Sequence, residues 1–297
     1  MGKQGEEAKM IYLGTSGFKY DEWRGSFYPP ELSPRDWLNF YCHRFNALEI
    51  NSSYYRLLHP ATYYHLGRKV PSGFLFTVKA YRGLTHQIGP QMKEELKAFL
   101  ESISPLREAG KLGCVVAQFP TSFHRSPAAL SHLELIRDGC ADIPLAVEFR
   151  HRSWATQETF DFLRLHRLGF VCVDEPAFPN LMPPLAVATA DFAYIRFHGR
   201  NYQRWWESGE EKLRYDYLYS EAELEEWMPR IEALSAHTHR VFIFMNNHFG
   251  GKAAINAQML AGLIEAKLPG SIPSPPGACQ SQSLQGDLPL GLSSSPP

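Results

Sequence analysis

Phe192-Ala193-Tyr194-Ile195-Arg196-Phe197-His198 is a short run of apolar and aromatic residues in which polar groups gather at the end. Runs this short, continuous and rich in β-branched or aromatic residues are typical of strands in a sheet that is covered on both faces. The chain holds eight such runs, namely Ile11–Thr15, Ala47–Asn51, Leu75–Lys79, Cys114–Gln118, Leu145–Phe149, Phe170–Asp174, Phe192–His198 and Val241–Asn246.

Helical patterns separate the runs. Ser126-Pro127 is a helix N-cap followed by proline at the first helical position, Ser220-x-x-Glu223 is a capping box, and Gly169 is typical of a helix C-cap. Eight strands that alternate with helices most simply close into a barrel. The rival, an open doubly wound sheet, lacks its glycine-rich turn, because Gly14-Thr15-Ser16-Gly17-Phe18 is not Gly-x-Gly-x-x-Gly. We therefore predict a single (β/α)8 TIM barrel.

The two ends of the chain differ in composition from the rest. Residues 1–9 form a short charged leader, and residues 269–297 are rich in Pro, Ser, Gly and Gln. A segment with so few large apolar residues cannot bury enough surface to offset its ordering entropy. We predict that residues 10–268 form the barrel domain and that residues 269–297 are disordered.

The overall charge gives no reason to expect nucleic acid or a membrane as a partner. Thirty Lys and Arg residues stand against 31 Asp and Glu residues, for a formal net charge of −1. No stretch approaches the ~18 consecutive apolar residues of a membrane span. The five cysteines are odd in number and form no Cys-x-x-Cys pair. We predict a cytoplasmic protein without structural disulfides.

Active sites of (β/α) barrels lie at the carboxyl ends of the strands, so the polar residues there are the site candidates. As catalytic groups we predict Glu49, Lys79, Glu148, Asp174 and His198. As substrate-binding groups we predict Asn51, Gln118, Arg150, His151, Arg196, Arg200, Asn246, Asn247, Gly250 and Gly251. The two glycines precede the last helix, where backbone N–H groups can approach an anion closely.

Strand alternation places Arg196 and His198 on one face, because residues two apart in a strand share a face. An arginine's planar fork of donors matches a carboxylate or a phosphate, so this pair is a candidate anion clamp. A deep arginine needs a partner. Glu148 and Asp174 are the candidates within the protein and a ligand anion is the other, which we favour.

Structural alternatives stand beside these functional interpretations. Glu49 and Glu148 can simply pair with Lys79 and Arg150 across the barrel mouth, and Asp174 can belong to a strand-ending turn. The aromatic pairs Tyr54-Tyr55 and Tyr63-Tyr64 favour packing over a substrate platform, whereas Trp205-Trp206 fits either role.

A divalent metal is a further alternative. Glu49, Glu148, Asp174 and His198 are suitable ligands from four strands. No short-spaced ligand motif is present, however, and nearby Lys79, Arg150 and Arg196 would repel a cation. We predict no metal or other cofactor.

The motifs resemble those of the DUF72 proteins, the YecE-like family of unknown function. They are Gly14-Thr15-Ser16-Gly17-Phe18-x-Tyr20-x-x-Trp23-x-Gly25-x-Phe27-Tyr28-Pro29, Glu49-x-Asn51-x-x-Tyr54-Tyr55, Phe76-x-Val78-Lys79-Ala80, Thr85-His86, Gln118-Phe119-Pro120, Glu148-Phe149-Arg150-His151-x-Ser153-Trp154, Arg196-x-His198-Gly199-Arg200 and Asn246-Asn247-His248. The resemblance runs from Ile11 to about Leu268. It implies a (β/α) barrel and no particular reaction.

Function must therefore be argued from the site itself. The leading hypothesis is an enzyme for a small anionic substrate, such as a sugar phosphate or a sugar acid. Arginines would bind the anion, Glu148 or Glu49 would be the general base, and His198 or Lys79 the acid or electrophile. The alternatives are a metal-assisted phosphodiesterase or nucleic-acid repair activity, and a barrel that binds a ligand without catalysis.

Overall fold

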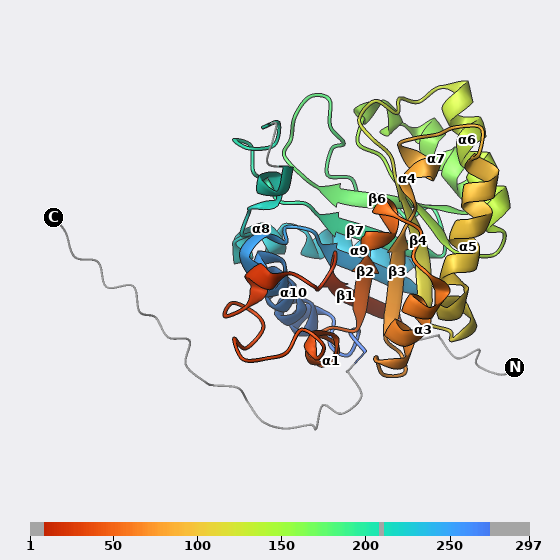
Figure 1. Cartoon of the computed structure of the whole chain (residues 1–297). Helices are drawn as coiled ribbons and strands as arrows, with labels where there is room; N and C mark the ends of the chain where they lie inside the picture. The colour runs from red at the N-terminus through yellow and green to blue at the C-terminus, as the bar shows by residue number, and fades with distance from the viewer. Residues whose placement is uncertain (1–8, 208–210, 274–297) are drawn as a thin grey trace, which may run out of the picture.

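Eight parallel strands form one continuous sheet in the computed structural model, which describes residues 9–207 and 211–273 of the chain (Figure 1). The strands are β1 (Met10–Thr15), β2 (Ala47–Ile50), β3 (Leu75–Lys79), β4 (Leu112–Gln118), β5 (Leu145–Glu148), β6 (Leu168–Asp174), β7 (Phe192–Phe197) and β8 (Arg240–Met245). Their order is β1-β8-β7-β6-β5-β4-β3-β2. Each strand coincides with one of the eight predicted runs, which confirms the predicted (β/α)8 barrel.

The barrel closes where β1 meets β2. At the carboxyl end of this seam, Ser16 forms a parallel bridge with Glu49, and the backbone N–H of Gly17 donates to the carbonyl of Glu49 across 2.9 Å. The closure thus fixes the backbone of a predicted site residue.

Deeper in the same seam, side chains replace strand pairing. The hydroxyl of Tyr41 accepts from the N–H of Thr15 (2.8 Å) and donates to the carbonyl of Ala47 (3.0 Å). The amide of Asn46 accepts from the N–H of Leu13 at 2.7 Å. Buried backbone groups must find partners, and here the side chains of Tyr41 and Asn46 provide them.

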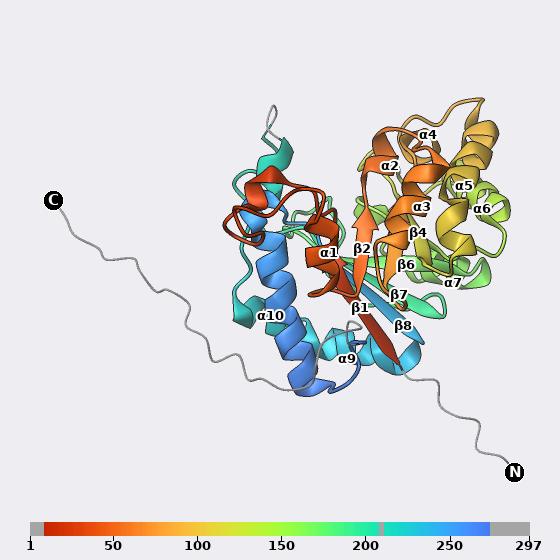
Figure 2. The ribbon, with the colours of Figure 1, turned by 60° about the horizontal axis from the view of Figure 1, so that its bottom comes forward.

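The helices lie outside the ring of strands, with α5 and α6 on the opposite side from α10 (Figures 1 and 2). They are α1 (Trp37–Cys42), α2 (Ser52–Tyr55), α3 (Pro60–Arg68), α4 (Arg82–Thr85), α5 (Met92–Glu108), α6 (Pro127–Cys140), α7 (Gln157–Leu165), α8 (Glu221–Glu225), α9 (Met228–His237) and α10 (Lys252–Lys267). Short 3-10 turns are η1 (Asp21–Trp23), η2 (Arg152–Trp154), η3 (Glu211–Tyr215) and η4 (Phe249–Gly251).

Two of the predicted helix signals are confirmed and one is wrong. Ser126 caps α6 by accepting from the N–H of Ala129, and Ser220 with Glu223 forms the capping box of α8. Gly169, predicted as a C-cap, lies in β6. A side chain at this position would collide with the ring of Phe192, so tight packing explains the glycine.

The connection between β6 and β7 departs from the regular alternation. Residues 175–191, all of them described, form no helix. Leu181 in this segment bridges to His151, and the hydroxyl of Thr189 donates to the carbonyl of Leu168 and accepts from the N–H of Phe170. The segment covers its side of the barrel through local contacts in place of a helix.

The barrel interior holds aromatic rings and polar groups side by side. Tyr12 stacks on Phe242 with 5.3 Å between ring centroids, and Tyr194 is in register with Phe242. The hydroxyl of Tyr194 on β7 lies 2.9 Å from the hydroxyl of Thr77 on β3, across the ring of strands, and it also donates to Glu49. Tyr194 therefore connects the aromatic packing of the interior to a predicted site residue.

The predicted tail begins in contact with the barrel. The carbonyl of Ser271 accepts from the N–H of Ile11 at 2.8 Å, and Ile272 packs against the core. The predicted leader, apart from Lys9, and the predicted tail from residue 274 onward lie outside the described residues.

Cys42, Cys114, Cys140 and Cys172 are free thiols. Within the described ranges, no helix combines the length and apolar character needed to cross a membrane.

Candidate active site at the carboxyl ends of the strands

Arg196 is the centre of a buried ion-pair network inside the barrel. Its Nη2 lies 2.6 Å from Oε1 of Glu49 on β2, and its Nη1 lies 2.5 Å from Oε2 of Glu148 on β5. Glu49 also accepts from the hydroxyl of Tyr194 at 2.6 Å. The prediction that a ligand anion is the partner of Arg196 is therefore wrong. Two carboxylates of the chain neutralise this guanidinium.

Arg150 extends the network towards the β6–β7 connection. Its Nε lies 2.8 Å from Oε1 of Glu148, and its Nη1 lies 2.8 Å from Oε2 of Glu175. Burial alone would raise the pKa of Glu148, but Arg196 and Arg150 outweigh burial and hold that pKa well below its usual range. Burial dominates at Glu175 and raises its pKa to about 7, although Arg150 acts in the opposite direction.

His198 lies next to Glu148 and is fully buried. Its Nδ1 accepts from the side-chain amide of Asn246 at 2.9 Å, which leaves the proton on Nε2, 3.3 Å from Oε1 of Glu148. Burial, followed by the charge of Arg150, lowers the pKa of His198 to about 3. The imidazole is therefore neutral at physiological pH, and its Nε2 lies against the carboxylate of Glu148.

Lys79 ends β3 and differs from the two arginines in its surroundings. Its Nζ donates to Oε1 of Gln118 at 2.8 Å and lies 4.5 Å from the ring centroid of Tyr54. Among the described residues, no carboxylate lies within ion-pair distance of this amine. Burial, together with the charge of Arg196, lowers the pKa of Lys79 to about 7. The amine can therefore exchange a proton near neutral pH.

A cavity of about 530 Å³ opens over this network. The predicted residues that line it are Glu49, Asn51, Lys79, Gln118, Arg150, Arg196 and Asn246. A larger hollow of about 860 Å³ lies at the opposite end, near the amino ends of β5, β6 and β7. We assign the site to the smaller cavity, because its floor carries the buried charges and the shifted pKa values.

Aromatic side chains that we did not predict as site residues form the walls of the cavity. They are Tyr20, Tyr54, Tyr55, Tyr215 and His248. The rings of Tyr20 and His248 stack almost parallel, with 4.7 Å between centroids and 2° between planes. Four of the five lie inside the motifs that carry the family resemblance, so those motifs could have identified them as site residues. Tyr215 had no such signal.

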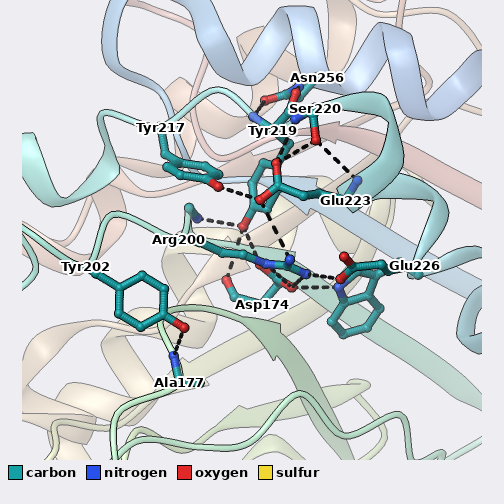
Figure 3. A network of polar contacts seen from close by, with 12 residues as sticks. Asp174, Ala177, Arg200, Tyr202, Tyr217, Tyr219, Ser220, Glu223, Glu226 and Asn256 are labelled. Carbon is teal, nitrogen blue, oxygen red and sulfur yellow. Dashed lines mark hydrogen bonds and ion pairs between the residues drawn. The ribbon is translucent and has the colours of Figure 1, made fainter.

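Asp174 and Arg200 belong to a separate cluster outside the ring of strands (Figure 3). Asp174 accepts from Nε and Nη2 of Arg200 (3.0 and 2.8 Å), from the hydroxyl of Tyr219 (2.6 Å) and from Nε1 of Trp227 (2.7 Å). Arg200 also pairs with Glu226 at 2.8 Å. The structure does not support the prediction that both residues act in the site, because neither lines the cavity and their polar groups join β6 to the segment around α8 and α9.

The remaining predicted residues also lie outside the cavity lining. The amide of Asn247 donates to the carbonyl of Tyr217 and to Asn256, so it anchors α10. Gly250 and Gly251 adopt positive φ angles in the turn before α10, and a side chain on Gly251 would meet Ser26. His151 stacks on His124, with 3.9 Å between ring centroids. None of these four predicted residues is among those that line the cavity.

The four proposed metal ligands do not converge. Glu49, Glu148 and His198 belong to the buried network, whereas Asp174 faces Trp227 and Arg200. No group of three or more His, Cys, Asp or Glu side chains within residues 9–207 and 211–273 is arranged to hold a metal ion.

The fold and the cavity together define a single-domain (β/α)8 barrel with a charged, aromatic-walled pocket at the carboxyl ends of its strands. Residues 12–278 match the model of the family described as "Protein of unknown function DUF72", and the chain belongs to this family. The UPF0759 protein YunF of Bacillus subtilis is 32 % identical over 279 residues, which are 89 % of this chain and 98 % of that protein.

Solved structures of the same family share the fold. A DUF72 family protein from Thermotoga maritima is 41 % identical, with a TM-score of 0.80 over 86 % of this chain and 99 % of that one. A DUF72 family protein from Enterococcus faecalis is 27 % identical, with a TM-score of 0.78 over 86 % of this chain and 96 % of that one.

Proposed function

We propose that this protein is an enzyme that acts on a small anionic substrate, such as a sugar phosphate or a sugar acid, by general acid–base chemistry in the cavity. The observation that carries the proposal is the state of Lys79. It reaches the cavity, its polar contact is the neutral amide of Gln118, and its pKa of about 7 suits proton transfer at physiological pH.

The charge pattern favours an anion over a neutral ligand. Arg196 and Arg150 are each balanced by carboxylates, whereas Lys79 is not, so an anionic group beside Lys79 would supply its missing counter-charge. Because the pKa of Lys79 is about 7, its amine can exchange a proton with a bound substrate at physiological pH. Arg150 uses Nε and Nη1 for its ion pairs, and the residue also lines the cavity.

The size and the other polar groups of the cavity favour a hydroxylated substrate of sugar size. A volume of about 530 Å³ holds a small metabolite. Oδ1 of Asn51 is buried at the cavity wall without a hydrogen-bond partner among the described residues. A buried acceptor without a donor is costly, and a substrate hydroxyl would satisfy it. Glu49, on the cavity floor, is the candidate base.

A metal-assisted reaction finds less support, because its proposed ligand Asp174 faces away from the cavity. A barrel that binds without catalysis shares the same pocket and differs only in turnover. Experiment can separate both alternatives from the proposal. A requirement for a metal ion would indicate the first alternative, and binding without product formation would indicate the second.

The test is ligand-induced stabilisation in a panel of sugar phosphates, sugar acids, inorganic phosphate and neutral sugars. A ligand at ~100-fold excess over its Kd stabilises the native state by ~2.7 kcal/mol, which a thermal scan detects. We expect the anions to raise Tm in the parent and in Arg107→Ala, whose exposed pair with Asp142 is remote from the cavity. Lys79→Met should lose the response.

Stabilising compounds are then incubated with the protein and followed by NMR for conversion. Stabilisation by neutral sugars as strong as that by anions, or an unchanged response in Lys79→Met, would refute the proposed substrate class. Binding without conversion of any stabilising compound would favour the non-catalytic alternative.

A further inference from the structure

We propose that Lys79 is a nucleophile that forms an imine with an aldehyde or ketone group of the anionic substrate. This inference rests on the proposed function and deepens it, because it names the reacting group as a carbonyl carbon and assigns Lys79 a covalent role.

The geometry at Lys79 suits an amine better than a permanent ammonium ion. The other cations on the cavity floor have carboxylates at ion-pair distance: Arg196 has Glu49 and Glu148, and Arg150 has Glu148 and Glu175. The Nζ of Lys79 has a neutral amide at 2.8 Å and the face of the Tyr54 ring at 4.5 Å. The amide and the ring are favourable contacts for an ammonium ion, but neither supplies a counter-charge. A partly buried cation without one is disfavoured, so the neutral form with its free lone pair becomes accessible.

Electrostatics act in the same direction. Burial and the charge of Arg196 lower the pKa of Lys79 to about 7, and Arg150 adds to this effect while Glu148 and Glu49 oppose it. An ordinary lysine has a pKa of ~10.4 and presents almost no free amine at neutral pH. Desolvation and a neighbouring cation are the two devices by which proteins activate a lysine for attack on a carbonyl group.

The cavity supplies the remaining requirements. In the step itself, the lone pair of Nζ forms a bond to the carbonyl carbon. The carbonyl oxygen leaves as water with the two protons that Nζ gives up, so no oxidant or reductant is consumed. The departing oxygen needs a proton donor and the nitrogen a base, and Glu49 lines the same cavity. The guanidinium of Arg150, also in the lining, is the contact for the anionic group of the substrate.

The experiment is reductive trapping of the full-length protein. Pyruvate, dihydroxyacetone phosphate and, as a carbonyl probe without an anion, acetone are each incubated with it near neutral pH in the presence of cyanoborohydride. Peptide mapping by mass spectrometry then locates the adduct, which for pyruvate adds the mass of pyruvate less one oxygen atom. Lys19 at the cavity rim and Lys111, which donates to the carbonyls of Gly67 and Val70, are internal controls in the same digest.

We expect an adduct at Lys79 with one or both anionic probes, formed on the order of a hundredfold faster than at the same lysine in the denatured chain, where the pKa returns to ~10.4. Inorganic phosphate should slow it by competition, and acetone should react far less. Lys79→Arg keeps a cation but cannot form an imine, so it should lose the adduct.

Labelling of Lys19 or Lys111 in preference to Lys79, or equal incorporation in Lys79→Arg, would overturn the inference. If Lys79→Arg fails to fold, the parent protein still tests the inference, because adduct formation at Lys79 that inorganic phosphate does not slow would overturn it. If anions stabilise the protein and Lys79→Met abolishes that effect while no adduct forms, the imine is refuted and the acid–base proposal stands. If anions also fail to bind, both the imine and the proposed function are refuted.

Discussion

Nη1 of Arg196 and Oε2 of Glu148 lie 2.5 Å apart in an ion pair whose side chains are 2 % and 0 % exposed. The pair joins β7 to β5 through the interior of the barrel, and Glu49 binds the same guanidinium from β2. Three strands that are not neighbours in the sheet are thus connected by one arginine. This arrangement ties the three strands together under the cavity, whereas the amine of Lys79 donates to the neutral amide of Gln118.

Arg196→Ala should destabilise the protein by about 3–5 kcal/mol, because it leaves Glu49 and Glu148 buried with one partner fewer. Urea unfolding measures this change. The control, Arg107→Ala, removes an exposed pair and should cost ~0–1 kcal/mol. A stable Arg196→Ala variant would show that the carboxylates take up protons or find other donors, and that the ion-pair network is not required for stability.

Asp174→Ala should also cost roughly 3–5 kcal/mol, because donors of Tyr219, Trp227 and Arg200 lose their common acceptor. Its ligand response should nevertheless stay intact, since these groups lie outside the cavity. The measurement is the anion-induced shift in Tm, compared between the variant and the parent. A variant of normal stability that no longer responds to anions would return Asp174 to the active site.

Tyr41→Phe tests the seam between β1 and β2. Loss of the hydroxyl leaves the N–H of Thr15 and the carbonyl of Ala47 buried without this partner, so we expect a loss of about 1–3 kcal/mol in the free energy of unfolding. Amide hydrogen exchange at Thr15 should accelerate more than exchange at Ile195, which lies in a fully paired strand. Equal acceleration at both positions would mean that the seam has no local role.

The fold could be predicted from the sequence because its signals are local. Each apolar run such as Leu75–Lys79 marks its own strand, and Ser126 and Ser220 mark the helix starts by chemistry that acts within four residues. Where packing overrides local preference, the prediction failed. Gly169 resembles a helix end, yet it is required in β6 by the ring of Phe192, a contact that sequence periodicity does not contain.

The site was predictable only in part, because strand alternation gives faces within a strand and not the register between strands. It correctly placed Arg196 and His198 together. Phe197, which lies between Arg196 and His198, points outward and packs on Trp227. Asp174 pairs in register with Phe197 and therefore points outward as well. The partnership of Arg196 with Glu49, 147 residues apart in sequence, follows from closure of the barrel and from no local pattern.

The boundary of the folded domain can be located by truncation. A chain that ends after Pro269 loses the carbonyl of Ser271, which accepts from the N–H of Ile11, and the packing of Ile272. We expect this truncation to cost about 1–3 kcal/mol. A chain that ends after Pro273 keeps both contacts, and from the composition of the removed residues we expect little change in Tm. Equal Tm values for the two truncations would support the boundary predicted at residue 268.

The pH dependence of Lys79 provides the most direct check of its environment. Charged groups face the amine from several elements: Arg196 from β7, Arg150 and Glu148 from the end of β5, Glu49 from β2 and His86 after α4. With a native pKa of about 7, competitive acetylation at low reagent concentration should reach half of its maximal rate near pH 7 in the folded protein. In the denatured chain the midpoint should move to ~10.4.

The same shift fixes the sign of a stability effect. Between pH 7 and ~10.4 the unfolded chain holds the proton on Lys79 and the native protein does not, so the contribution of this residue to stability rises with pH in that window. Lys79→Met removes the titrating group. The free energy of unfolding of the parent should therefore gain on that of Lys79→Met as pH increases from 7 to 9. A difference between the two proteins that stays constant or shrinks across this range would show that the amine is protonated in the native site, and that it acts there as a fixed cation.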